Sequence, residues 1–163
     1  MAGMFPTMVR DPNDPNRDYS AKRAPGDPWP NTMRAAYYLI CAAGVLMLVI
    51  ALLLLSAEVP QDTPDEAWRQ TLATNKAVTA WGNIILAVVL VGAASYFPKG
   101  SRVARRLAAG CVALACFLNV AAFIVRLTAW ASMIVVILLA VSMLLAFRPD
   151  SNAFVEEKSP RFQ

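Results

Sequence analysis

The segment "AAYYLICAAGVLMLVIALLLL", residues Ala35–Leu55, runs for 21 residues without a charged side chain. A helix of roughly 17–25 apolar residues crosses a hydrocarbon core about 30 Å thick. In lipid the backbone N–H and C=O groups must be bonded within the protein, and a helix bonds them within one segment. The segment therefore predicts a transmembrane helix, and the remainder of the chain repeats its pattern.

Three further apolar runs follow, and the charged residues are gathered between them. We therefore predict an all-α, polytopic membrane protein with four transmembrane helices, over about residues 35–55, 78–97, 107–125 and 130–147. The composition agrees, because 58% of the 163 residues are hydrophobic and 16% are charged, against roughly 45–50% and about 25% in soluble domains. Buried helices of a soluble bundle would need polar faces that these runs lack.

The basic residues predict the orientation. Twelve of the fifteen Lys and Arg residues precede the first run, separate the second from the third, or follow the fourth. Because cytoplasmic loops are enriched in Lys and Arg, we expect a multi-pass plasma-membrane protein with both termini in the cytoplasm. The net charge of +4 then reflects topology and contact with anionic lipid, and we expect no nucleic-acid partner.

The residues before the first run, 1–31, predict an extended, proline-rich cytoplasmic leader. The first run begins too late and is too long for a secretory signal peptide, so we expect it to remain as an anchor. The leader is too polar to order itself, so it is either disordered or held by a partner. Its predicted docking residues are Arg10, Asp11, Pro12, Asp14, Pro15, Arg17 and Tyr19.

The transmembrane domain is predicted over residues 32–148, followed by a polar cytoplasmic tail over 149–163. At its start, Asn31 or Thr32 is expected to cap the first helix. In the tail, Phe154 and Val155 are the only apolar residues expected to anchor it.

The longest connection, residues 56–77, predicts a short helix over about 64–74 on the outer membrane surface, running into the second span. Thr63 and Glu66 have the spacing of a capping box, with Pro64 at the first helical position. Asp62, Asp65 and Glu66 form a carboxylate cluster that could bind a cation. Acidic residues at a helix N-terminus are, however, also expected from the helix dipole alone.

The connection "PKGSRVARR", residues 98–106, predicts a tight cytoplasmic hairpin in which Ser101 caps the next helix. Its cluster of basic residues suits lipid head groups or an acidic partner subunit, and simple fixing of the topology explains it equally well. The residues concerned are Lys99, Arg102, Arg105 and Arg106.

One face of the third run carries small residues and one asparagine at helical spacing. This face predicts a helix-packing seam, since small residues let helices approach and a membrane asparagine bonds a neighbouring helix. Alternatively, Asn119 with Arg126, joined by Asn83 of the second run, could line a polar ligand site. The seam residues are Ala108, Cys111, Ala115, Asn119 and Ala122.

The sequence also argues against several activities. The chain contains no histidine, and no Asp or Glu lies within any of the four runs. Histidine-ligated haem, most zinc sites, the commonest general base and a membrane proton relay are therefore not expected. We accordingly expect no enzyme activity, no cofactor and no metal site.

In its length, four spans, proline-rich leader and lack of redox ligands, the chain resembles the small accessory subunits of actinobacterial respiratory supercomplexes, in which cytochrome bc and cytochrome oxidase modules associate. The resemblance implies a non-catalytic role in assembling or stabilising a larger membrane complex. Haem and copper would then lie on other integral membrane subunits. These subunits, together with anionic lipids, would be the partners of this chain. The alternative is a small-molecule or lipid carrier with a polar cavity between its spans.

Overall fold

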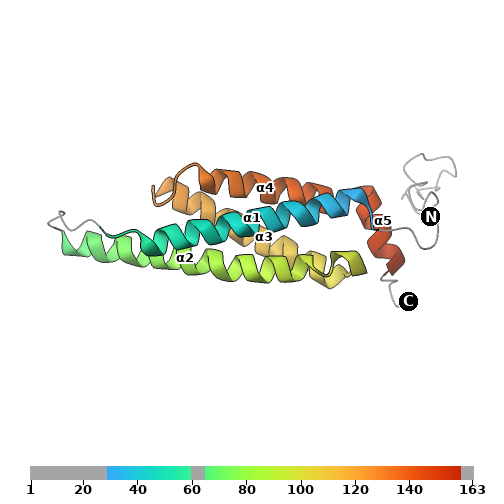
Figure 1. The fold of residues 1–163 in the computed structure, drawn as a ribbon, viewed down its shortest axis with the longest axis horizontal. Helices are drawn as coiled ribbons and strands as arrows, with labels where there is room; N and C mark the ends of the chain where they lie inside the picture. The colour runs from blue at the N-terminus through green and yellow to red at the C-terminus, as the bar shows by residue number, and fades with distance from the viewer. Residues whose placement is uncertain (1–28, 60–64, 159–163) are drawn as a thin grey trace, which may run out of the picture.

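A computed structural model describes residues 29–59 and 65–158, and within these ranges all regular structure is helical. The leader up to residue 28, the residues Thr63 and Pro64 of the expected capping box, and the end of the tail lie outside the described residues. The elements are α1 (Asn31–Ser56), α2 (Glu66–Ala94), a short 3₁₀ helix η2 (Phe97–Lys99), α3 (Arg102–Ile124), α4 (Ala131–Ala146) and α5 (Pro149–Lys158). The all-α prediction is confirmed (Figure 1).

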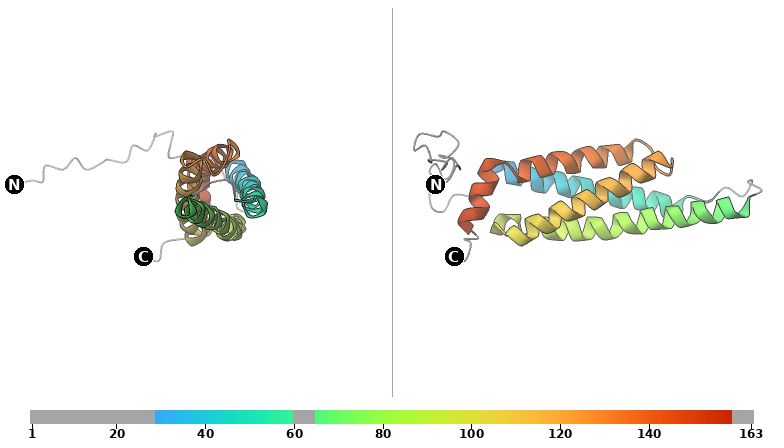
Figure 2. Two further views of the ribbon diagram at one scale, coloured as in Figure 1. Left: turned by 90° about the vertical axis from the view of Figure 1, so that its left-hand side faces the viewer. Right: turned by 180° about the vertical axis from the view of Figure 1, so that it is seen from behind.

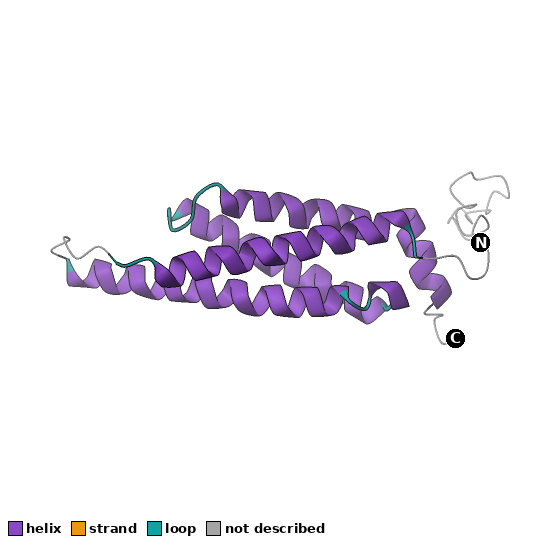
Figure 3. Ribbon diagram, viewed as in Figure 1, coloured by secondary structure: helices purple, strands orange, loops and turns teal. Residues whose placement is uncertain are grey.

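The four long helices form a closed antiparallel bundle. Contacts link α1 to α2 and α4, and α3 to α2 and α4, so that each helix packs between two neighbours. Figure 2 shows the bundle from two other directions, and Figure 3 shows in the view of Figure 1 that α5 lies across one end. The core consists mainly of apolar side chains, of which Met33, Ile40 and Met47 of α1 are fully buried.

Three helical segments are each long and apolar enough to cross a membrane: α1, the segment Glu66–Lys99 formed by α2 and η2, and α3. Helix α4 has 16 residues and reaches this length only together with α5, from which it is bent by 61°. Residues 29–59 and 65–158 therefore contain three candidate spans, or four if the bent pair counts as one. This agrees with the predicted class of polytopic helical protein.

The start of α1 differs from the prediction. Asn31 is the first helical residue, Pro30 occupies the N-cap position, and no side chain caps the helix. Thr32 instead makes a tertiary hydrogen bond of 2.9 Å with the hydroxyl of Ser151 in α5. Because the Ser151 hydroxyl donates to the carbonyl of Leu145 at 3.0 Å and has one proton, Thr32 is the donor.

The short surface helix expected over residues 64–74 is helical from Glu66 and runs into the second span, as expected. Its described residues form the first turns of α2, which continues without a break to Ala94. No glycine or proline occurs between residues 65 and 82, so nothing in the sequence interrupts the helix. The N-cap is Asp65, whose side chain accepts hydrogen bonds from the backbone N–H groups of Ala67 and Trp68.

The turn between α2 and α3 agrees with its sequence signals. Gly100 has a left-handed backbone with φ 66° and ψ 27°, which is a conformation that glycine adopts at no steric cost. Ser101 is the N-cap of α3, as predicted, and its hydroxyl accepts a hydrogen bond from the N–H of Ala104 at 3.3 Å. A Cβ atom added at Gly100 would lie 2.5 Å from the Cβ of Lys158, so α5 packs directly on this turn.

The first ten residues of the expected polar tail form helix α5. Pro149 begins the helix, where its missing N–H costs nothing, and it also prevents α4 from continuing. Phe154 and Val155, the two expected anchors, are both buried. A segment expected to be only anchored is therefore a packed element that closes one end of the bundle.

We predict that Gly100→Ala destabilises the bundle by about 1–2 kcal/mol, because an alanine at positive φ is strained and its Cβ would displace α5. The matched control is Gly110→Ala, where an added Cβ meets nothing within 4 Å; this change favours the helix and should not lower the melting temperature. Thermal unfolding in mild detergent measures both variants. Equal melting temperatures for the two would contradict the packing of α5 on the turn.

Candidate functional site

The most buried polar contact of the bundle joins α2 to α3. The side-chain amide of Asn119 donates through Nδ2 to the Oδ1 of Asn83 at 2.9 Å and to the backbone carbonyl of Ala115, also at 2.9 Å. Both asparagines have no exposed surface. The structure thus brings together two of the three residues of the alternative polar site, and it bonds them to each other.

Two atoms of this asparagine pair have no hydrogen-bond partner, namely Nδ2 of Asn83 and Oδ1 of Asn119. The two amides therefore exchange one hydrogen bond where a reciprocal pair would exchange two. An unbonded polar group in an apolar interior costs free energy. Breaking the single bond would therefore destabilise the bundle by more than the strength of that bond alone. Losing it would leave further polar atoms without partners.

Arg126, the third residue of the alternative polar site, lies elsewhere. It is exposed in the turn after α3 and has a left-handed backbone with φ 58°, a conformation that is strained for a residue with a side chain. The turn is closed by a hydrogen bond of 2.9 Å from the N–H of Leu127 to the carbonyl of Ala122. The cation is thus turned outward by the backbone that ends α3.

The expected seam of α3 lies mostly in the interior. Ala108, Ala115, Asn119 and Ala122 are buried and Cys111 is half-buried. On the facing helix, a Cβ atom added at Gly82 would lie 2.7 Å from the side chain of Leu118. Small residues therefore allow α2 and α3 to approach closely.

Arg105 differs from the other residues of the basic cluster. Its guanidinium donates to the side-chain oxygen of Asn152 at 2.6 Å and to the carbonyl of Ala146 at 3.4 Å, and it lies 4.7 Å from the ring centre of Phe147. It therefore binds the end of α4 and the start of α5, a role that its position in a basic cluster did not predict. The backbone carbonyls at a helix end lack intrahelical partners, and Arg105 supplies one.

The remaining cations of the cluster stay accessible. Lys99 and Arg106 are exposed and Arg102 is half-buried. The ammonium of Lys99 lies 4.7 Å from the ring centre of Tyr96. These three residues are thus available to an anionic partner or to lipid phosphates, as the sequence suggested for all four.

The two described members of the suggested carboxylate cluster, Asp65 and Glu66, act at the start of α2. Asp65 caps the helix, and Glu66 forms an ion pair with Arg69 one turn later. Asp62, the third member of the suggested cation site, lies outside the described residues. The helix-terminus explanation therefore accounts for the two carboxylates that are described.

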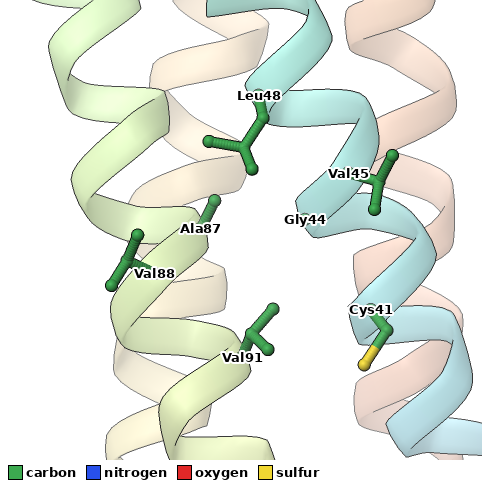
Figure 4. A pocket seen from close by; sticks show the side chains of 7 residues that line it. All are labelled: Cys41, Gly44, Val45, Leu48, Ala87, Val88 and Val91. Atoms are coloured by element: carbon green, nitrogen blue, oxygen red, sulfur yellow. The ribbon is translucent and has the colours of Figure 1, made fainter.

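A groove between α1 and α2 was not expected from the sequence. Its volume is about 380 Å³, and its lining is almost wholly apolar. Figure 4 shows the sulfur of Cys41 and the side chain of Val91 facing the gap between the two helices. The sequence signal, visible only in retrospect, is a group of small residues at helical spacing; the full lining is Cys41, Gly44, Val45, Leu48, Ala87, Val88 and Val91.

Comparison with protein-family models, with curated proteins and with solved structures finds no match to this chain. The predicted docking residues of the leader, from Arg10 to Tyr19, lie outside the described residues and stay a prediction.

We predict that Asn83→Ala and Asn119→Ala are each destabilising but not additive, because either change leaves the other amide buried without its partner. The coupling free energy should be about 0.6–1.7 kcal/mol, the range found for hydrogen bonds between membrane helices. A double-mutant cycle on unfolding in detergent measures it. Strict additivity of the two single effects would contradict a role for this bond in holding α2 against α3.

Proposed function

We propose that the chain is a four-span plasma-membrane protein with both termini in the cytoplasm, and that it is a non-catalytic accessory subunit of a larger membrane complex. Helix α4 crosses the membrane together with its flanking residues Trp130 and Phe147. Helix α5 then lies at the cytoplasmic surface with the basic turn that precedes α3. The excess of basic residues at this end supports the orientation.

The observation that carries the proposal is the outer arm, which we define as residues 66–78 of α2. None of its residues is buried, and the first buried residue of the helix is Thr79. Figure 1 shows the arm continuing past the ends of the other three long helices. Thirteen residues extend about 20 Å, and a helix of this length is marginal in water without packing. A partner subunit that covers the arm would supply that packing.

The arm also carries residues suited to an interface. Trp68 is 47% exposed, and Leu72 follows it at a spacing of four, so that both lie on one face of the helix. Aromatic residues are enriched at protein interfaces and often dominate their energetics. The arm therefore offers an apolar anchor on a largely polar helix outside the membrane.

The interior of the bundle favours the subunit over the carrier. A carrier needs polar groups that face a cavity, whereas Asn83 and Asn119 bond each other in the core and Arg126 is exposed. The seam residues are used for packing between helices. The surfaces left for function are the outer arm, the basic turn and the lipid-facing sides of the helices.

The layout resemblance to accessory subunits of respiratory supercomplexes supplies the first partners to test. Affinity purification of the tagged full chain in mild detergent, followed by mass spectrometry, is expected to recover other integral membrane subunits in fixed proportion. A monodisperse single chain without such partners would overturn the subunit proposal and favour the carrier.

We predict that Trp68→Ala lowers recovery of the partner subunits about tenfold or more, since loss of an interface tryptophan commonly costs 2 kcal/mol or more. Thr74→Ala is the matched control, because it is exposed on another face of the same arm. Both variants should keep the wild-type melting temperature, as neither residue packs in the bundle. Equal recovery with the two variants would show that the arm does not dock through Trp68.

A further inference from the structure

The groove between α1 and α2 lies where the two helices separate. Figures 1 and 2 show α1 and α2 together near the end of α1 and diverging towards its start, the end at which α5 lies. Gly44 marks the close approach, since a Cβ atom added there would lie 2.9 Å from a methyl carbon of Val91. The lining of the groove on α1, from Cys41 to Leu48, extends on both sides of this contact.

The groove is too narrow for another helix. Its lining on α1 extends from Cys41 to Leu48, which corresponds to about 10 Å of helix. A volume of about 380 Å³ over that length gives a mean width of about 6 Å, whereas a helix with its side chains is about 10–12 Å across. A single hydrocarbon chain fits this width.

A cation continues the groove towards the cytoplasmic end of α1. Arg34 and Tyr38 are exposed, and with Cys41, Val45 and Leu48 they recur every three or four residues, which places all five on one stripe of the helix. At the corresponding end of α2, the exposed Lys99 follows in η2. Arg34 therefore continues the stripe of α1 that lines the groove, and Lys99 lies at the same end of the bundle.

The spacing along α1 matches one leaflet of a membrane. Arg34 and Gly44 are ten residues apart, or about 15 Å along a helix. Half of a hydrocarbon core about 30 Å thick is the same distance. A lipid whose head group is at the level of Arg34 would thus place the end of its acyl chain in the groove.

We propose that this groove is a binding site for an anionic phospholipid of the cytoplasmic leaflet. One acyl chain lies between α1 and α2, and the phosphate is bound by Arg34, with Lys99 as the second cation. The site rests on the proposed membrane embedding and orientation, but it does not require the partner subunit. The positive charge of Arg34 and Lys99 selects an anionic head group, and the narrow apolar gap between α1 and α2 binds the acyl chain.

The test uses the full chain in phosphatidylcholine vesicles that contain a minor fraction of phosphatidylglycerol with a photoreactive group near the end of one acyl chain. After irradiation, mass spectrometry should place the adducts on peptides containing residues 41–48 and 87–91. Photoreactive phosphatidylcholine at the same fraction should label these peptides less. Adducts spread evenly over all four long helices, or equal labelling by the two lipids, would overturn the site.

Two variants examine the two parts of the site. Arg34→Gln should lower groove labelling by phosphatidylglycerol about fivefold, as expected when one basic residue near an anionic lipid is lost, and should leave labelling by phosphatidylcholine unchanged. Arg148→Gln, which removes an exposed cation between α4 and α5, is its matched control. Cys41→Phe should fill the gap and abolish groove labelling by both lipids, whereas Ile137→Phe, at an exposed position on α4, should not.

The outcomes separate this site from the proposed function. Extraction of the chain from membranes by alkaline carbonate would overturn the membrane embedding and the lipid site with it. Recovery of partner subunits by a chain that shows no groove labelling would overturn the lipid site alone. Groove adducts replaced by cross-links to another chain would identify a protein occupant and overturn the lipid. Because Arg34 is exposed, its variant tests the site even if Cys41→Phe does not fold.

Discussion

The hydrogen bond between Asn119 and Asn83 fixes how α3 lies against α2. In an apolar bundle most side chains pack almost equally well in neighbouring registers, and helices in lipid gain no hydrophobic free energy by associating. A polar pair meets in only one register, and sliding the helices by one turn would leave the Asn83 amide without a partner, whereas Asn119 would keep its bond to Ala115 of its own helix. The small residues beside this pair then set how closely the two helices approach.

Helix α5 supplies a hydrogen-bond donor to the backbone carbonyls that are left free at the end of α4. Three of its contacts tie it to the bundle: Ser151 bonds the carbonyl of Leu145, Thr32 of α1 bonds Ser151, and Arg105 of α3 bonds Asn152. One short helix thereby connects the starts of α1 and α3 to the end of α4. These contacts explain why Arg105 and Thr32 bond α5. The sequence had suggested that Arg105 contacts lipid and that Thr32 caps a helix.

The sequence was informative wherever a residue acts through its own helix. The apolar runs predicted the long helices, and Ser101 was correctly predicted to cap α3. The helical spacing in α3 predicted residues that are mostly buried. These features depend only on the length of an apolar run and on the helical period. The sequence did not predict the role of a residue whose contacts are with residues far along the chain. Thr32 and Arg105 are bound by α5, and no local signal in "PDSNAFVEEK" announces a packed helix. The largely polar residues 66–77 were expected to begin with a short surface helix that runs into the second span, and in the structure they form the first turns of one long helix, α2.

Helix α2 is apolar between residues 78 and 94 and polar before them, and it continues without a break from one part to the other; in the proposed membrane embedding its surroundings change from lipid to water. The polar turns contact the end of α1, where the ammonium of Lys76 donates to the carbonyl of Ala57, but none of residues 66–78 is buried within the described chain. A helix extended beyond its own core is best explained by a second protein that receives it. The same reasoning separates the two surfaces proposed for binding: the outer arm meets a protein because it is in water, and the groove meets a lipid because it is narrow, apolar and open to the membrane.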